Sequence, residues 1–168
     1  MALVLVRAAG SADVPDIVRV QRSAWETGGF VPAAVLDQLP IELAEDTWNA
    51  AVSEPPSPRH HVLVAQEQDW VVGFAAVGPA TDSADGEIST LLVEPRWGRR
   101  GHGSRLLAAA TDHLRGDGFE TALAWISDRD KASRQFYESA GWQPDGLART
   151  LDADGTELRE IRLHTALS

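Results

Sequence analysis

The sequence predicts one α/β (α+β) domain over residues 1–168, built on a mixed sheet that helices flank. Two observations carry this prediction. Short runs rich in β-branched residues and longer runs with helical periodicity follow one another in the order β, α, α, β, β, β, α, β, α, β, β. The length of 168 residues, with 43% hydrophobic and 24% charged residues, suits a single folded domain with one core.

The N-terminal third is predicted to contain one strand and two helices. The apolar run 3–8 predicts the opening strand. A helix follows, because Pro15 suits a first helical turn and Gly28–Gly29 ends the apolar periodicity. A second helix is expected over about 32–52, broken or restarted at Pro40, before a proline-rich loop.

The rest of the chain alternates strands with two further helices. Pro95 ends the third of these strands, and Gly116 and Gly141 end the helices. Strands are expected over 61–65, 70–77, 87–93, 121–126, 142–149 and 156–164, and helices over 103–115 and about 130–140.

Composition excludes several classes of function. The chain has no cysteine, which excludes disulfides, thiolate nucleophiles and Cys-based zinc sites. A formal net charge of −10 disfavours nucleic acid as a partner. No apolar run approaches the ~18 residues that a membrane-spanning helix needs, so we expect a cytoplasmic protein with no membrane partner. No metal is expected, because neighbouring strand residues such as His60 and His61 point to opposite faces.

Charge is unevenly distributed along the chain. Residues 23–58 contain six acidic residues and no basic one, whereas residues 94–105 contain four arginines and one glutamate. The basic cluster indicates a bound anion. For the acidic segment, with Trp25, Phe30 and Trp48, two interpretations stay open: a solvated face over the core, or an electronegative pocket for a cationic amine.

The basic cluster lies in a loop between a predicted strand and a predicted helix. Unpaired N–H groups and the helix macrodipole make a helix N-terminus a ready anion site, and Gly101 and Gly103 allow a ligand close to the backbone. A P-loop is excluded because no Lys–Ser or Lys–Thr pair follows the glycines. Leu106 stands where a dinucleotide-binding fingerprint needs a small residue. The loop is therefore predicted to hold another phosphate or diphosphate ligand.

This loop resembles motif A of the GCN5-related N-acetyltransferase (GNAT) superfamily, written Q/R-x-x-G-x-G/A, with Gly101 and Gly103 at its last two positions. Gly98 stands at the first position, and the neighbouring Arg99 is the candidate replacement donor. The likeness extends to the hairpin sequence WVVGF (70–74), the strand EISTLLVEP (87–95) and the helix RDKASRQFYESAGW (129–142), which resembles motif B with Arg129 where asparagine is common.

The resemblance implies a mixed, mostly antiparallel sheet of about six to seven strands, flanked by about four helices and splayed between strands four and five. It also implies acetyl-CoA as co-substrate and an acceptor site built from the first two helices. The implied acceptor residues are Trp25, Glu26 and Phe30. The implied cofactor-binding residues are Leu91, Val93, Arg99, Arg100, Gly101, His102, Gly103 and Ser104.

Transfer of an acetyl group to an amine needs a base, because a lysine-like amine is neutral only about once in a few thousand molecules at pH 7. At the position that the family uses, Glu87 is the candidate base, with a water-mediated route through Glu26 as the alternative. Tyr137, the only tyrosine of the chain, falls where the family places the donor to the leaving thiolate. Its reference pKa of ~10 favours hydrogen bonding over complete proton transfer.

We therefore predict an acetyl-CoA-dependent N-acetyltransferase that acts on a primary amine, with a small molecule favoured, by direct transfer in a ternary complex. The absence of cysteine argues against a Cys-linked acyl-enzyme. Two alternatives stay open: a non-catalytic acyl-CoA-binding module, and a protein N-terminal or lysine acetyltransferase. Because members of the family are often dimers, a homodimer is a further expectation.

Overall fold

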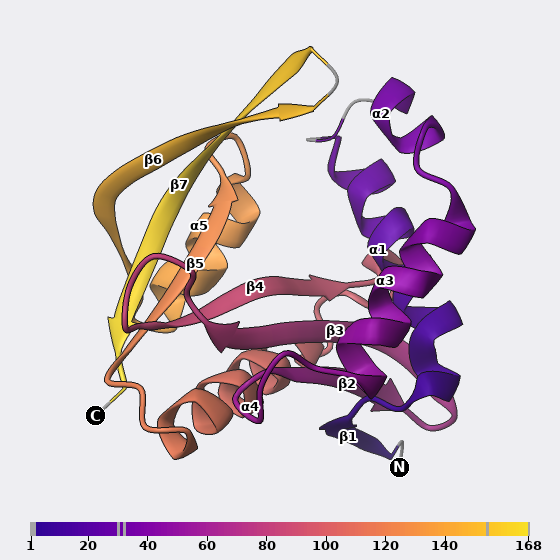
Figure 1. Ribbon diagram of the computed structural model, residues 1–168, viewed down its shortest axis with the longest axis horizontal. Helices are drawn as coiled ribbons and strands as arrows, with labels where there is room; N and C mark the ends of the chain where they lie inside the picture. Colours follow the sequence, from indigo (N-terminus) through magenta and orange to yellow (C-terminus); the bar gives the residue numbers. More distant parts are fainter. Residues whose placement is uncertain (1–2, 30, 32, 154, 168) are drawn as a thin grey trace.

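The structure is a computed structural model that describes residues 3–29, 31, 33–153 and 155–167. Within these residues, seven strands form one sheet in the order β1-β2-β3-β4-β5-β7-β6 (Figure 1). All neighbouring strands are antiparallel except β4 and β5, which are parallel. The strands are β1 (Val4–Ala8), β2 (His61–Glu67), β3 (Trp70–Pro79), β4 (Gly86–Val93), β5 (Thr121–Ser127), β6 (Gln143–Ala153) and β7 (Thr156–Ala166).

Five α-helices lie in the described part of the chain, and the break expected at Pro40 separates two of them. The helix expected over 32–52 is two helices, because Pro40 has an extended backbone (φ −62°, ψ 137°) and its ring cannot donate the N–H that a continuous helix requires. The helices are α1 (Val14–Gly28), α2 (Ala33–Asp37), α3 (Ile41–Ser53), α4 (His102–Gly116) and α5 (Lys131–Ser139).

Helices cover both faces of the sheet, with α1 and α3 on one face and α4 on the other (Figure 1). The alternation of apolar side chains in β2 explains this arrangement. Val64 packs with Ile17 of α1, whereas Leu63 on the opposite face packs with Leu106 of α4. Burial of both faces makes the central strands apolar throughout.

The parallel strands β4 and β5 separate soon after they meet. Over the described residues they pair only from Gly86 to Ile88 of β4, and beyond this point they diverge (Figure 1). A β-bulge explains the bend, because Ala76 of β3 opposes Thr90 while its neighbour Val77 opposes Ile88, which leaves Ser89 as an extra residue in β4. The splay predicted between the fourth and fifth strands is confirmed.

Candidate active site

A cleft of about 640 Å³ occupies the opening between β4 and β5. Trp25 of α1 lines it from one face of the sheet, and Gly103 of α4 and Tyr137 of α5 line it from the other. The cleft therefore reaches through the sheet and connects its two faces. The other lining residues are Ala24, Thr27, Gly28, Val31, Ile88, Ser89, Thr90, Leu91, Leu92, Val93, Pro95, Trp125, Ile126, Ser127, Asp130, Ala132, Ser133, Phe136 and Glu160.

The loop before α4 has the backbone of an anion site. Arg99 and Gly101 both adopt left-handed conformations (φ 63° and 83°), and α4 begins directly afterwards at His102. The first N–H groups of a helix have no partner within the helix and carry partial positive charge. Arg99, Arg100 and Ser104 are exposed around this helix end, so the loop can bind a doubly charged group such as a diphosphate.

The part of the cleft that adjoins this loop, here called the slot, fits an extended and largely apolar part of a ligand. The first turn of α4 lies beside α5 and β4 at this point, where a Cβ at Gly103 would make ordinary contacts, 3.4 Å from Cε1 of Phe136 and 3.9 Å from Cγ2 of Val93. Leu91 and Val93 line the slot. Backbone groups of β4 beyond Ile88 have no β5 partner among the described residues, so they are free to pair with a ligand. The predicted cofactor residues and this slot together fit coenzyme A.

His102 anchors the loop from within the protein. Its side chain is 1% exposed, and its Nε2 lies 3.0 Å from Oε1 of Glu67 on β2. Its Nδ1 accepts a hydrogen bond from Nη2 of Arg105 at 3.1 Å, which leaves the proton on Nε2. The other oxygen of Glu67 accepts a hydrogen bond from Nη1 of Arg100 at 2.9 Å. The imidazole of His102 is thus turned away from the ligand side of the loop, and the residue can offer its backbone N–H.

Tyr137 of α5 lines the cleft. Its side chain is buried, and its ring packs edge-to-face against Phe136 and Trp142, with centroid separations of 5.4 and 5.0 Å. Burial raises the pKa of Tyr137 well above its ordinary value, and the negative charge of Asp130 raises the pKa further. The hydroxyl therefore stays protonated at physiological pH and can act as a hydrogen-bond donor.

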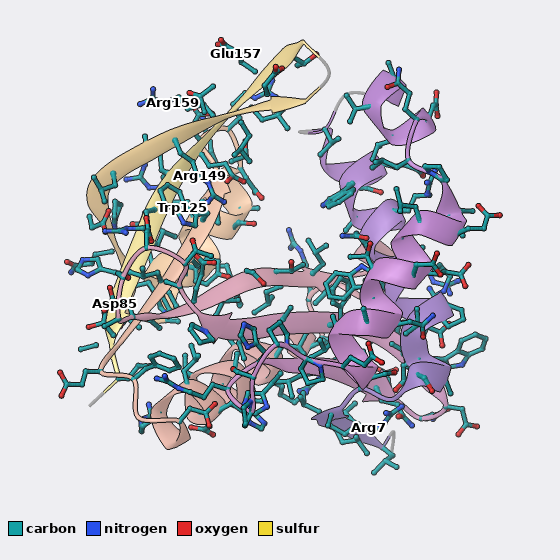
Figure 2. All side chains as sticks on the ribbon, viewed as in Figure 1. Arg7, Asp85, Trp125, Arg149, Glu157 and Arg159 are labelled. Carbon is teal, nitrogen blue, oxygen red and sulfur yellow. The ribbon has the colours of Figure 1, made fainter. Side chains whose placement is uncertain are left out.

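Glu87 lies where β4 and β5 still pair, at the closed end of the splay. Burial raises the pKa of Glu87 above its ordinary value, and the positive charge of Arg149 partly offsets this effect. Glu87 is not among the described residues that line the cleft, and it lines a second cavity on the α3 side of the sheet. Its neighbour Trp125 lines the cleft and holds Arg149 against its ring, with Cζ 4.2 Å from a ring centroid (Figure 2).

The three predicted acceptor residues differ from one another in their position relative to the cleft. Trp25 lines the cleft, whereas Glu26 is exposed and is not among the described residues that line it. Phe30 lies outside the described residues. Sequence reasoning missed Trp125 and Glu160, because no motif marks them and only the pairing of β5 with β7 brings them to the cleft.

Two other findings concern the described residues alone. They contain no cluster of three or more His, Asp or Glu residues arranged to hold a metal ion. None of the helices they form has both the length and the apolar character needed to cross a membrane.

Comparison with known proteins gives consistent matches. The profile of the acetyltransferase (GNAT) family matches residues 19–142. YuaI of Bacillus subtilis (strain 168), an uncharacterized N-acetyltransferase, is 29% identical over 168 residues that cover 96% of this chain and 92% of that protein. The N-alpha-acetyltransferase RimI of Mycobacterium tuberculosis is 32% identical over 111 residues, which cover 64% of this chain and 68% of RimI.

A solved structure shows the same fold. The PaiA N-acetyltransferase from Thermoplasma acidophilum, in complex with coenzyme A, matches with a TM-score of 0.80 at 15% identity, covering 98% of this chain and 99% of that chain. The family profile spans both the loop before α4 and the helix α5 that suggested the resemblance, so the predicted family is confirmed. The chain belongs to the acetyltransferase (GNAT) family of acetyl-CoA-dependent N-acetyltransferases.

Proposed function

We propose that the protein transfers the acetyl group of acetyl-CoA to the primary amine of a small molecule while both substrates are bound. One observation carries this proposal: the cleft between β4 and β5 opens on both faces of the sheet. The anion site of α4 lies on one face and Trp25 of α1 on the other. Two substrates can therefore approach from opposite sides and meet within the sheet, with no covalent enzyme intermediate.

The residues of the loop and of β4 would hold acetyl-CoA, which supplies an acetyl thioester. The N–H groups of 100–104 and the side chains of Arg99 and Arg100 bind its diphosphate. Leu91 and Val93 contact the extended arm that leads into the cleft. The unpaired backbone groups of β4 then orient the acetyl end toward the opposite face.

Two side chains assist the reaction, Glu87 as a proton acceptor and Tyr137 as a hydrogen-bond donor. Glu87 accepts a proton from the ammonium form of the acceptor, directly or through water, and its raised pKa brings it nearer to the operating pH. Tyr137 donates a hydrogen bond to the sulfur as negative charge develops there. Its raised pKa keeps this donor intact across the physiological range.

The nature of the acceptor defines the alternative. RimI is an N-alpha-acetyltransferase, and its similarity to this chain favours a protein N-terminus as the second candidate. We favour a small molecule because two aromatic side chains, Trp25 and Trp125, line the acceptor half of the cleft and offer contacts to a small organic group. Glu160 and Asp130 also line the cleft, where Glu160 is paired with Arg149 at 2.7 Å and Asp130 accepts hydrogen bonds from Ser133 at the start of α5.

Release of free coenzyme A tests the proposal with little background, because the protein has no cysteine to react with a thiol reagent. The purified protein is mixed with acetyl-CoA and with a panel of amines, amino acids and short peptides. Turnover of small amines above that of peptides supports the proposal. Turnover of peptides alone indicates the protein-directed reaction. Binding of acetyl-CoA without turnover of any acceptor indicates a non-catalytic acyl-CoA-binding module.

A further inference from the structure

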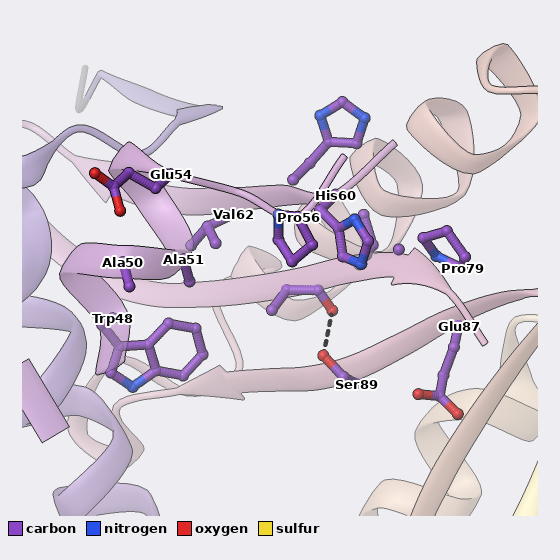
Figure 3. A pocket seen from close by; sticks show the side chains of 14 residues that line it. Trp48, Ala50, Ala51, Glu54, Pro56, His60, Val62, Pro79, Glu87 and Ser89 are labelled. Atoms are coloured by element: carbon purple, nitrogen blue, oxygen red, sulfur yellow. Dashed lines mark hydrogen bonds between the residues drawn. The ribbon is translucent and has the colours of Figure 1, made fainter. Parts of the chain in front are cut away.

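A second cavity of about 360 Å³ lies between α3 and the central strands (Figure 3). We propose that this cavity takes the uncharged apolar group of the acceptor, so that the preferred acceptors are arylalkylamines and similar primary amines without a carboxylate. The inference rests on the proposed function and names its substrate class. It is supported by the position of the cavity, by its walls and by its charge.

The position of the cavity connects it to the place of reaction. Ser89, the bulge residue of β4, lines both the second cavity and the cleft. Glu87, the proposed base, also lines the second cavity (Figure 3). Because β4 is shared, an amine that reaches the cleft near Glu87 can place the rest of the molecule under α3.

The walls of the cavity are apolar and firmly held. Trp48 and Ala51 of α3 lie on one side, and Val62 of β2 contributes from the sheet. The indole of Trp48 is fixed by a hydrogen bond to Oε1 of Gln21 (3.1 Å) and by edge-to-face contact with Phe74 (5.1 Å between centroids). A volume of about 360 Å³ suits a small organic group, and rigid apolar walls favour an aromatic one.

Apart from its carboxylates, three polar side chains of the cavity are engaged within the protein. The hydroxyl of Ser89 donates to the carbonyl of Ala76 at 3.1 Å. Nδ1 of His60 lies 2.7 Å from Oγ of Ser57, and Nε2 of His61 lies 2.7 Å from Oδ2 of Asp117. A ligand thus meets few free hydrogen-bonding groups, which disfavours a strongly polar substituent.

The charge of the cavity distinguishes amines from amino acids. Its carboxylates are Glu87 and Glu54, and no lysine or arginine is among the described residues that line it. An ammonium group finds a partner in Glu87. A carboxylate on the same substrate would meet these like charges, and Arg149, whose positive charge acts on Glu87, is already paired with Glu160 at 2.7 Å, so amino acids should be poor acceptors.

The first test compares acceptors of matched structure with the wild-type protein. We expect kcat/KM for 2-phenylethylamine to exceed that for ethylamine by about tenfold or more, because the cavity buries the ring. We expect it to exceed that for phenylalanine, which differs by one carboxylate, by about a hundredfold. Equal rates for phenylethylamine and ethylamine, or a preference for phenylalanine or 1,4-diaminobutane, would overturn the inference.

The second test fills the cavity. Ala51→Phe places a ring inside it and should lower the ratio of kcat/KM for phenylethylamine to that for ethylamine by about tenfold. The ratio is measured in one preparation, so partial misfolding cancels. The matched control Asn49→Phe, at an exposed position of α3 that does not line the cavity, should leave the ratio unchanged. An unaltered ratio in Ala51→Phe overturns the inference alone, whereas lack of turnover with every amine overturns the proposed function as well.

Discussion

Nε2 of His102 lies 3.0 Å from Oε1 of Glu67, which joins the first residue of α4 to the last residue of β2. Through its second oxygen Glu67 also holds Arg100, at 2.9 Å. One carboxylate therefore fixes two residues of the loop that is proposed to bind the diphosphate. A loop fixed before binding loses less conformational entropy when the ligand arrives.

Removal of this anchor should weaken cofactor binding. Glu67→Ala is expected to raise the Kd for acetyl-CoA about tenfold, as titration calorimetry would measure, with little change in kcat at saturation. Glu67→Gln keeps one acceptor oxygen, for either His102 or Arg100, and turns an N–H donor toward the other, so its Kd should lie between those of the wild type and Glu67→Ala. A Kd at the wild-type value in Glu67→Ala would contradict the anchoring role of Glu67.

Loss of the proposed base should change both the rate and its pH dependence. Because burial raises the pKa of Glu87, the acidic limb of kcat/KM should lie above the ordinary glutamate value: the rate falls as the pH drops through this pKa and the carboxylate becomes protonated. Glu87→Gln should lower kcat/KM by about a hundredfold and remove this limb. Acetyl-CoA affinity serves as the control and should not change. A variant that retains the limb would assign it to another group.

Removal of the Tyr137 hydroxyl should affect chemistry more than binding. Tyr137→Phe is expected to lower kcat by about ten- to a hundredfold and to leave acetyl-CoA affinity nearly intact. The pKa of this phenol is raised, so its ionisation should not produce an alkaline limb in the neutral range. Turnover at the wild-type rate would exclude Tyr137 as the donor.

Charge placed at the loop should abolish cofactor binding without unfolding the protein. A Cβ at Gly103 would make only ordinary contacts, at 3.4 Å or more, so both Gly103→Ala and Gly103→Asp should fold with similar thermal midpoints. Gly103→Asp adds a carboxylate where an anion is expected to bind, and no calorimetric heat with coenzyme A is expected. Gly103→Ala is the matched control and should retain binding. Normal binding by the aspartate variant would contradict the assigned loop.

An ion pair between the buried Asp13 and the exposed Arg7 should make stability depend on pH. Asp13 accepts hydrogen bonds from Nη1 and Nη2 of Arg7 and from the backbone N–H of Gly10, each at 2.8 Å. The hydrogen bonds from Arg7 hold the pKa of Asp13 below its ordinary value. Asp13→Asn should therefore lower the free energy of unfolding at pH 7 by about 1–2 kcal/mol.

The direction in which the free energy of unfolding changes with pH tests this prediction. The contribution of Asp13 is complete above the pKa that this group has in the unfolded chain, and it is lost as the pH falls through the lower pKa of the folded state. Denaturant titrations of wild type and variant should therefore converge in strong acid. A constant difference across the whole pH range would show that packing, and not ionisation, causes the loss.

The sequence predicts the local features of the fold correctly, and it marks the loop that is proposed to bind the diphosphate. Each of the seven strands overlaps its predicted range, because alternation and β-branched runs are local signals, and the loop before α4 is marked by glycines and arginines that adjoin one another. Features that depend on distant partners were missed. Glu67 and His102 are 35 residues apart in the chain, and the second cavity combines α3 with three strands. Packing, which no local pattern encodes, brings these residues together.

The opening between β4 and β5 depends on the one extra residue that the bulge at Ser89 adds to β4. Deletion of Ser89 alone would retain Glu87, Tyr137 and the proposed cofactor-binding residues. However, β4 would lose the extra residue that bends it away from β5. The rest of β4 would then pair with β5 as a regular parallel ladder, and this pairing would close the cleft. Such a deletion should yield a protein with a more regular sheet but no activity, because the opening between β4 and β5 is lost.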